Sequence, residues 1–112
     1  MAVAETKENN VVVLTITDKL DTEETTVLEK KVVDLLEAGE ITFLFDFSDL
    51  DYINSSGLRV LVMAYQRLMK HQGKVAICSI KDYIQEIFEI SGYDKLFAIY
   101  PTRDEAMAEI GA

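Results

Sequence analysis

Strand-like and helix-like segments alternate along almost the whole chain. Residues 41–47 and 75–80 are rich in β-branched, aliphatic and aromatic side chains, as buried strands are. Between them, residues 58–69 repeat apolar side chains at the spacing of one helix face. Strands that alternate with helices predict parallel strand pairs joined by right-handed crossovers. The pattern therefore predicts an α/β fold.

The N-terminal segment predicts the one antiparallel element. Residues 3–7 and 11–16 are β-prone, and Asn9 and Asn10 between them tolerate positive φ, so they suit a two-residue hairpin turn. Strand 11–16 has apolar residues on both faces, which places it inside the sheet. We expect one domain over residues 1–112, with a mixed sheet and about four helices packed mainly on one face, because each helix carries a single apolar stripe.

The predicted helices have recognisable ends. Asp21 and Glu24 have the spacing of a capping box with Asp21 as N-cap, and Gly39 supplies the stop. Thr102 and Glu105 form a second capping box before a terminal helix. The other expected elements are a helix at roughly 55–71 that ends at Gly73, a helix from Asp82 to Gly92 and a last strand at 96–100.

Composition limits the classes of partner that the protein is expected to bind and indicates its cellular compartment. The net charge of −9, from 20 acidic and 11 basic residues, opposes binding to nucleic acid or to an anionic membrane. No apolar run approaches the ~20 residues of a membrane span, and the first residues lack the features of a secretory signal. The single cysteine, Cys78, lies in a strand-like run, where we expect a buried, inert thiol. A cytoplasmic protein is therefore expected.

The polar stretch 51–59 joins strand 41–47 to the following helix and places two hydroxyls and a glycine at the helix N-terminus. Unpaired N–H groups and the positive end of the helix dipole meet there, so this end can hold an anion. A serine at that position could become the anion by phosphorylation.

Two strand-to-helix junctions are predicted to meet. The carboxyl ends of parallel strands lie on one edge of a sheet, and loops at that edge carry the sites. We therefore expect Asp18 and Asp21, which follow strand 11–16, to lie near Asn54, Ser55 and Ser56.

These residues resemble the STAS domain of bacterial anti-sigma factor antagonists. The resemblance lies in Leu20-Asp21 before the first helix and in Ile53-Asn54-Ser55-Ser56-Gly57-Leu58 before the second. It covers essentially the whole chain in one colinear register. Its further matches are Gly73, Cys78-Ser79-Ile80, Phe88-Glu89-Ile90-Ser91-Gly92 and Leu96-Phe97.

The resemblance implies a switch protein that is neither an enzyme nor bound to a cofactor. In this family, an anti-sigma factor that is also a serine kinase of the histidine-kinase-like ATPase fold captures the unphosphorylated antagonist, which releases a sigma factor. Phosphorylation ends the binding, and a metal-dependent serine phosphatase restores it. The family's phosphoacceptor falls on Ser55, with Ser56 as the alternative. The expected partner-binding residues are Asp21, Asn54, Ser55, Ser56, Gly57, Leu58 and Arg59.

Three positions depart from the family pattern. Asn54 stands where the family often has Asp, which removes one negative charge beside the acceptor. Asp18 and Arg59 stand where Gly is common, and Arg59 could pair with a phosphate on Ser55.

Residue chemistry alone leaves alternatives open. Ser55 could be a plain N-cap, since Ser is among the preferred residues there. Gly57 could be tolerated in the first turn, or its missing side chain could let a partner approach closely. The alternatives to a phosphorylation-switched binder are a non-switching STAS scaffold and a small-ligand-sensing module.

An enzyme or a metal site has little support in the sequence. The one histidine, His71, lies about a helix length from Ser55, so a Ser–His nucleophile is implausible. There is no Gly-rich phosphate loop with Lys and no paired Cys/His metal spacing. Asp46, Asp49 and Asp51 could suggest a metal cluster, but we expect solvated loop carboxylates.

Overall fold

Two asparagines turn the chain near its N-terminus. In the computed structural model, which describes residues 2–111, β1 (Val3–Glu8) and β2 (Val11–Ile16) pair antiparallel. Asn9 and Asn10 between them have φ of 50° and 68°. Positive φ at both central residues is what a tight two-residue hairpin turn requires. The predicted hairpin is confirmed.

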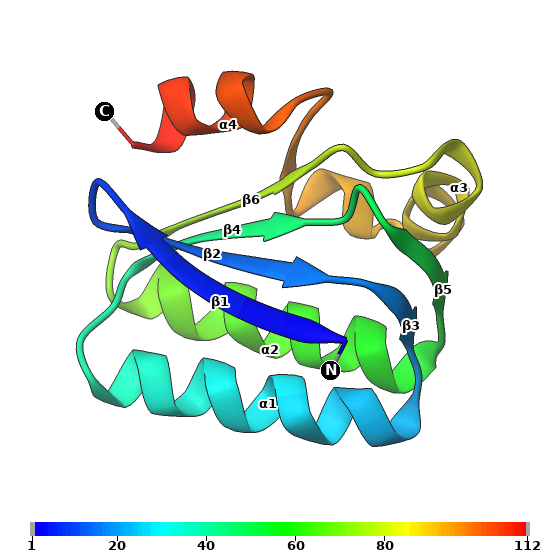
Figure 1. Cartoon of the computed structure of the whole chain (residues 1–112), viewed down its shortest axis with the longest axis horizontal. Helices are drawn as coiled ribbons and strands as arrows, with labels where there is room; N and C mark the ends of the chain where they lie inside the picture. Colours follow the sequence, from blue (N-terminus) through cyan, green and yellow to red (C-terminus); the bar gives the residue numbers. More distant parts are fainter. Residues whose placement is uncertain (1, 112) are drawn as a thin grey trace.

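Three further strands extend the sheet in parallel. β4 (Thr42–Asp46), β6 (Lys74–Cys78) and β7 (Ala98–Tyr100) give the order β1-β2-β4-β6-β7 (Figure 1). β2 pairs with β4, β4 with β6, and β6 with β7, all parallel. The mixed α/β sheet predicted from the alternation of segments is confirmed.

Helices cover both faces of this sheet unequally. α1 (Thr22–Glu37) and α2 (Ser55–Lys70) lie along one face, and α4 (Arg103–Ile110) lies across the other (Figure 1). α3 (Asp82–Ser91) joins the larger core through Ile84 and Phe88. Packing mainly on one face is thus confirmed, with α4 as the exception.

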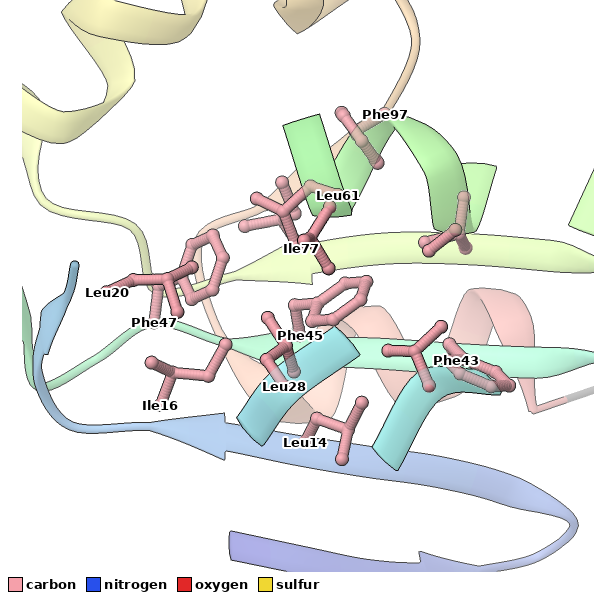
Figure 2. Close-up of a cluster of buried hydrophobic side chains, with 14 of the residues drawn as sticks. Leu14, Ile16, Leu20, Leu28, Phe43, Phe45, Phe47, Leu61, Ile77 and Phe97 are labelled. Atoms are coloured by element: carbon pink, nitrogen blue, oxygen red, sulfur yellow. The ribbon is translucent and has the colours of Figure 1, made fainter. Parts of the chain in front are cut away.

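Side chains along each strand point alternately to the two faces of the sheet, which explains why helices cover both faces. Figure 2 shows Leu14, Phe43 and Phe45 of the sheet directed toward the helix residues Leu28 and Leu61, and all five side chains are fully buried. The neighbouring positions on the strands point the other way. On that opposite face a smaller cluster contains Val11, Val13, Leu44, Ala76, Cys78, Ala106 and Ile110.

A second, two-stranded sheet was not expected. β3 (Asp18–Leu20) pairs in parallel with β5 (Leu50–Ile53) beyond the carboxyl ends of β2 and β4 (Figure 1). Part of the stretch predicted as a loop is therefore strand. Strands of three and four residues are too short for side-chain periodicity to reveal.

The C-terminal half differs from the prediction at two boundaries. α2 ends at Lys70 with His71 as its C-cap, and Gln72 rather than Gly73 takes the left-handed conformation, with φ of 57°. Position 73 requires glycine for another reason, which is the close approach of the backbone to Ile41. A Cβ at this position would lie 2.4 Å from the carbonyl oxygen of Ile41. The last strand starts only at Ala98, after a 3-10 turn over Tyr93–Lys95.

Within residues 2–111, no helix is both long enough and apolar enough to cross a membrane.

Cys78 is fully buried, as predicted. Burial raises the pKa of its thiol from 9.0 to about 11, and the nearby Asp46 carboxylate adds to the rise.

This pKa predicts a loss of stability at alkaline pH. Below about pH 9 the thiol is protonated in both the folded and the unfolded chain. Between pH 9 and about 11 only the unfolded chain loses the proton, so the free energy of unfolding falls, by about 2–3 kcal/mol in total. Urea unfolding across this range should show the fall in the wild type. Cys78→Ala, which retains every tyrosine and lysine, should lose that component; equal pH profiles would contradict the assignment.

Candidate functional site

The small sheet brings two helix N-termini together. Leu20, at the end of β3, pairs with Ile53, at the end of β5, and each strand leads within two residues into α1 or α2. The Asn54 N–H donates to the carbonyl of Leu20 at 3.3 Å, and the Asn54 amide donates to the Thr22 hydroxyl at 3.4 Å. We call residues 20–24 and 53–59 the junction rim. The prediction that Asp21 lies near residues 54–56 is confirmed.

Each helix of the rim is capped by the residue before it. The Asp21 carboxylate accepts from the Glu24 N–H at 3.2 Å, as the capping box predicted. The Asn54 side-chain oxygen accepts from the Gly57 N–H at 3.1 Å. Asn54 is therefore the N-cap of α2, and the interpretation of Ser55 as a plain N-cap is wrong. Asn is as good a cap as Ser, and here it comes one residue earlier.

The two serines of the rim differ in their surroundings. Ser55 is the first residue of α2 and is exposed, and its hydroxyl has no hydrogen-bond partner within residues 2–111. Ser56 is half-buried, and its hydroxyl donates to the Asn54 side-chain oxygen at 2.9 Å. Only Ser55 therefore offers a free hydroxyl to solvent.

Gly57 has a packing role in the interior of the protein. It is buried, and a Cβ on it would lie 2.9 Å from Ile53 Cγ1 and 2.9 Å from Leu20 Cγ. The missing side chain thus lets α2 pack against the small sheet, which accounts for the glycine without a partner. Leu58 is also buried, at 9% exposure. Both residues hold the rim in place from beneath.

Arg59 is the cationic member of the rim. It lies one helical turn after Ser55, and its side chain is 63% exposed. Its guanidinium lies 3.6 Å from the carboxylate of Glu29 on α1. This ion pair joins α1 to α2, and the sequence carried no signal for it.

Asp18 does not lie where the sequence placed it. It starts β3 opposite Leu50, and its N–H donates to the carbonyl of Asp49 at 2.8 Å, so it is at the far end of the small sheet from Ser55. Its φ is 69°, at a shift in the strand register. That backbone conformation favours glycine, and Asp is among the residues that tolerate it.

The three aspartates at the end of β4 and after it, Asp46, Asp49 and Asp51, have separate roles. Asp46 is 8% exposed and lies 3.7 Å from Arg103 of α4, so the expectation that it is solvated is wrong. Its side chain points to the face of the sheet that α4 covers. Asp49 is exposed, as expected. Among residues 2–111, no group of three or more His, Cys, Asp or Glu side chains is placed to hold a metal ion.

Asp51 anchors the small sheet to α3. Its carboxylate accepts hydrogen bonds from the Lys81 ammonium and, at 3.3 Å, from the Tyr83 hydroxyl. The hydrogen bond from Lys81 holds the pKa of Asp51 below its usual range, and the same contact raises the pKa of Lys81.

His71 caps the opposite end of α2, so no imidazole stands near Ser55.

Comparison with known proteins decides the family. The sequence profile of the STAS domain matches residues 2–106. The chain belongs to the STAS domain family. BtrV of Bordetella bronchiseptica, which is named as an anti-sigma factor antagonist, is 36% identical to it over 81 residues, covering 72% of this chain and 70% of that protein. The resemblance inferred from the junction sequences is thereby confirmed.

Solved structures of anti-sigma factor antagonists share this STAS fold. One from Thermotoga maritima superposes with a TM-score of 0.93 at 25% identity, covering 98% of this chain and 95% of that one. The phosphorylated form of SpoIIAA from Bacillus superposes with a TM-score of 0.81 at 19% identity, covering 97% and 99% of the two chains. The second likeness concerns the fold alone.

Gly57→Ala tests how this STAS domain builds its rim. The new methyl group would meet two buried side chains at 2.9 Å, and such overpacking costs about 1–3 kcal/mol. The gain in helix propensity, up to about 1 kcal/mol, does not offset that loss. We expect a lower free energy of unfolding in urea. Ser55→Ala, two positions earlier and exposed, should stay within about 0.5 kcal/mol of the wild type; equal stability of the two variants would refute the packing role.

Proposed function

We propose that the junction rim is the surface through which the unphosphorylated protein binds an anti-sigma factor, and that phosphorylation of Ser55 ends this binding. The partner would be a serine kinase of the histidine-kinase-like ATPase fold, and its capture would release a sigma factor in the cytoplasm. The observation that carries the proposal is the free, exposed hydroxyl of Ser55 at the point where both helix junctions meet.

The surroundings of the two serines favour Ser55 as the acceptor. A kinase must bring the serine oxygen up to the γ-phosphorus of ATP, and the exposed Ser55 hydroxyl breaks no contact to get there. Ser56 would first have to give up its 2.9 Å hydrogen bond to the cap of α2. Ser55 is therefore assigned as the phosphoacceptor, with Asp21, Asn54, Ser56 and Arg59 as exposed or half-exposed neighbours in the interface.

The chemistry of the switch divides between the two proteins. The Ser55 oxygen attacks the γ-phosphorus, ADP leaves with the electrons of the broken P–O bond, and the hydroxyl proton goes to a base of the kinase, since no imidazole stands near Ser55. A serine phosphatase restores the hydroxyl by hydrolysis: water adds to the phosphorus, the bond to the Ser55 oxygen breaks, that oxygen takes up a proton, and inorganic phosphate leaves. The role of this chain is to present Ser55 on a rigid helix end.

Charge explains why a phosphate would end binding without refolding the domain. It adds about −1.5 to −2 charges next to Asp21, Glu23 and Glu24, which are the charged residues of the first junction. The first turn of α2 tolerates an anion, whereas a packed partner surface must desolvate it. A loss of about 2–3 kcal/mol of binding would weaken affinity roughly 30- to 150-fold. A local clash is therefore sufficient.

The names and solved structures of related proteins support the same proposed function. BtrV and the Thermotoga maritima protein are both named as anti-sigma factor antagonists. SpoIIAA has solved structures in an unphosphorylated and a phosphorylated form, so this fold is compatible with both states in that protein.

Substitutions of Ser55 test the proposal. Ser55→Ala should bind the anti-sigma kinase as tightly as the wild type and keep binding it in the presence of ATP, because the acceptor is gone. Ser55→Asp should bind more weakly, although one carboxylate carries less charge than a phosphate. The measurement is affinity by calorimetry before and after kinase treatment, with mass spectrometry of the treated protein.

Ser56→Ala is the matched control, and it should still be phosphorylated and switched. Phosphate found on Ser56 alone would move the site by one residue. A rim that binds the kinase but takes up no phosphate would instead identify a non-switching scaffold.

A further inference from the structure

Arg59 holds a special position in the charge pattern of the rim. Residues 20–29 contain no lysine or arginine, and Arg59 is the one cation among residues 53–59. A phosphate on Ser55 would therefore have carboxylates on the first junction and a single guanidinium, that of Arg59, within the rim part of its own helix. Any local neutralisation of that phosphate within the rim falls to Arg59.

The geometry of α2 places Arg59 within reach of Ser55. The two residues are four apart in one helix, so their Cβ atoms lie about 6 Å from each other on the same face. Helical side chains lean toward the N-terminus and cover the preceding turn, which for Arg59 is the turn that begins with Ser55. The side chain is 63% exposed and is not locked by packing.

Arg59 already binds an oxyanion, but loosely. Its contact with Glu29 is 3.6 Å long, and both side chains are exposed, at 63% and 42%. Exposed pairs of this kind contribute little to stability. A phosphate offers nearly twice the charge of a carboxylate and the oxygen geometry for a paired contact with guanidinium. The phosphate is therefore the stronger competitor for Arg59.

We infer that Arg59 exchanges partners on phosphorylation: it pairs with Glu29 of α1 in the unphosphorylated protein and with the phosphate of Ser55 afterwards. This inference rests on the proposed phosphorylation of Ser55. The exchange takes a cation away from α1, leaves Glu29 unpaired beside the rim and holds the phosphate on α2. Phosphorylation would then alter the rim beyond the one residue that it modifies.

The test uses the full chain with phosphoserine incorporated at position 55 during translation, so it does not depend on a kinase. Titration of the phosphate by ³¹P NMR gives its second pKa. In the wild type, Arg59 should favour the dianion and lower this pKa by about 0.3 relative to Arg59→Gln. Arg59→Lys keeps the charge without the paired geometry and should fall between the two.

Two further variants separate the exchange from a general charge effect. Arg67→Gln removes the same charge from the same helix at a point about 18 Å along the axis from Ser55, and it should leave the pKa unchanged. Glu29→Gln should lower the pKa more in the presence of Arg59 than in the Arg59→Gln background, because it removes the competitor for the guanidinium.

Equal pKa values for the wild type and Arg59→Gln would overturn the inference, as would an equal effect of Arg67→Gln. The same Glu29→Gln effect in both backgrounds would show that Glu29 acts by its own charge alone, which would refute the exchange. Failure of the proposed function would appear separately, as absence of phosphate on Ser55 after kinase treatment.

Discussion

The pairing of Leu20 with Ile53 is the contact on which the candidate site depends. It joins two strands that are far apart in the sequence, and each strand leads directly into a helix. Both side chains are buried, and Gly57 packs against them with no room for a side chain of its own. The N-termini of α1 and α2 are thereby held side by side, although no residue of the rim itself belongs to the main sheet.

Neighbouring residues at the start of α2 divide the structural and the regulatory role between them. Asn54 caps α2 and holds Ser56, which leaves Ser55 without a structural task. A helix start normally consumes the hydroxyl of its serine, and such a serine could not be modified without loss of the cap. Here the cap and the acceptor are separate residues, so a phosphate can be added or removed while the helix remains intact.

The sequence predicted those features whose causes are local. The Asn9-Asn10 turn and the capping boxes at Asp21 and Thr102 each depend on residues within a few positions. The pairing of β3 with β5, the Arg59–Glu29 contact and the burial of Asp46 against Arg103 join segments 30 or more residues apart, and no periodicity reports them. The cap of α2 stays open in the sequence for another reason, since Asn54 and Ser55 are both good N-caps and only the structure shows which one is used.

We propose that a partner contacts the junction rim and that Ser55 controls this contact. The most direct measurement is an NMR titration of the ¹⁵N-labelled protein with its anti-sigma kinase, in the unphosphorylated form and in the form with phosphoserine at position 55. The account predicts that residues 20–24 and 53–59 shift most in the unphosphorylated form, that α4 is unaffected, and that the phosphorylated form shows no shifts at the same concentration. A footprint centred on α4, or equal footprints for the two forms, would contradict it.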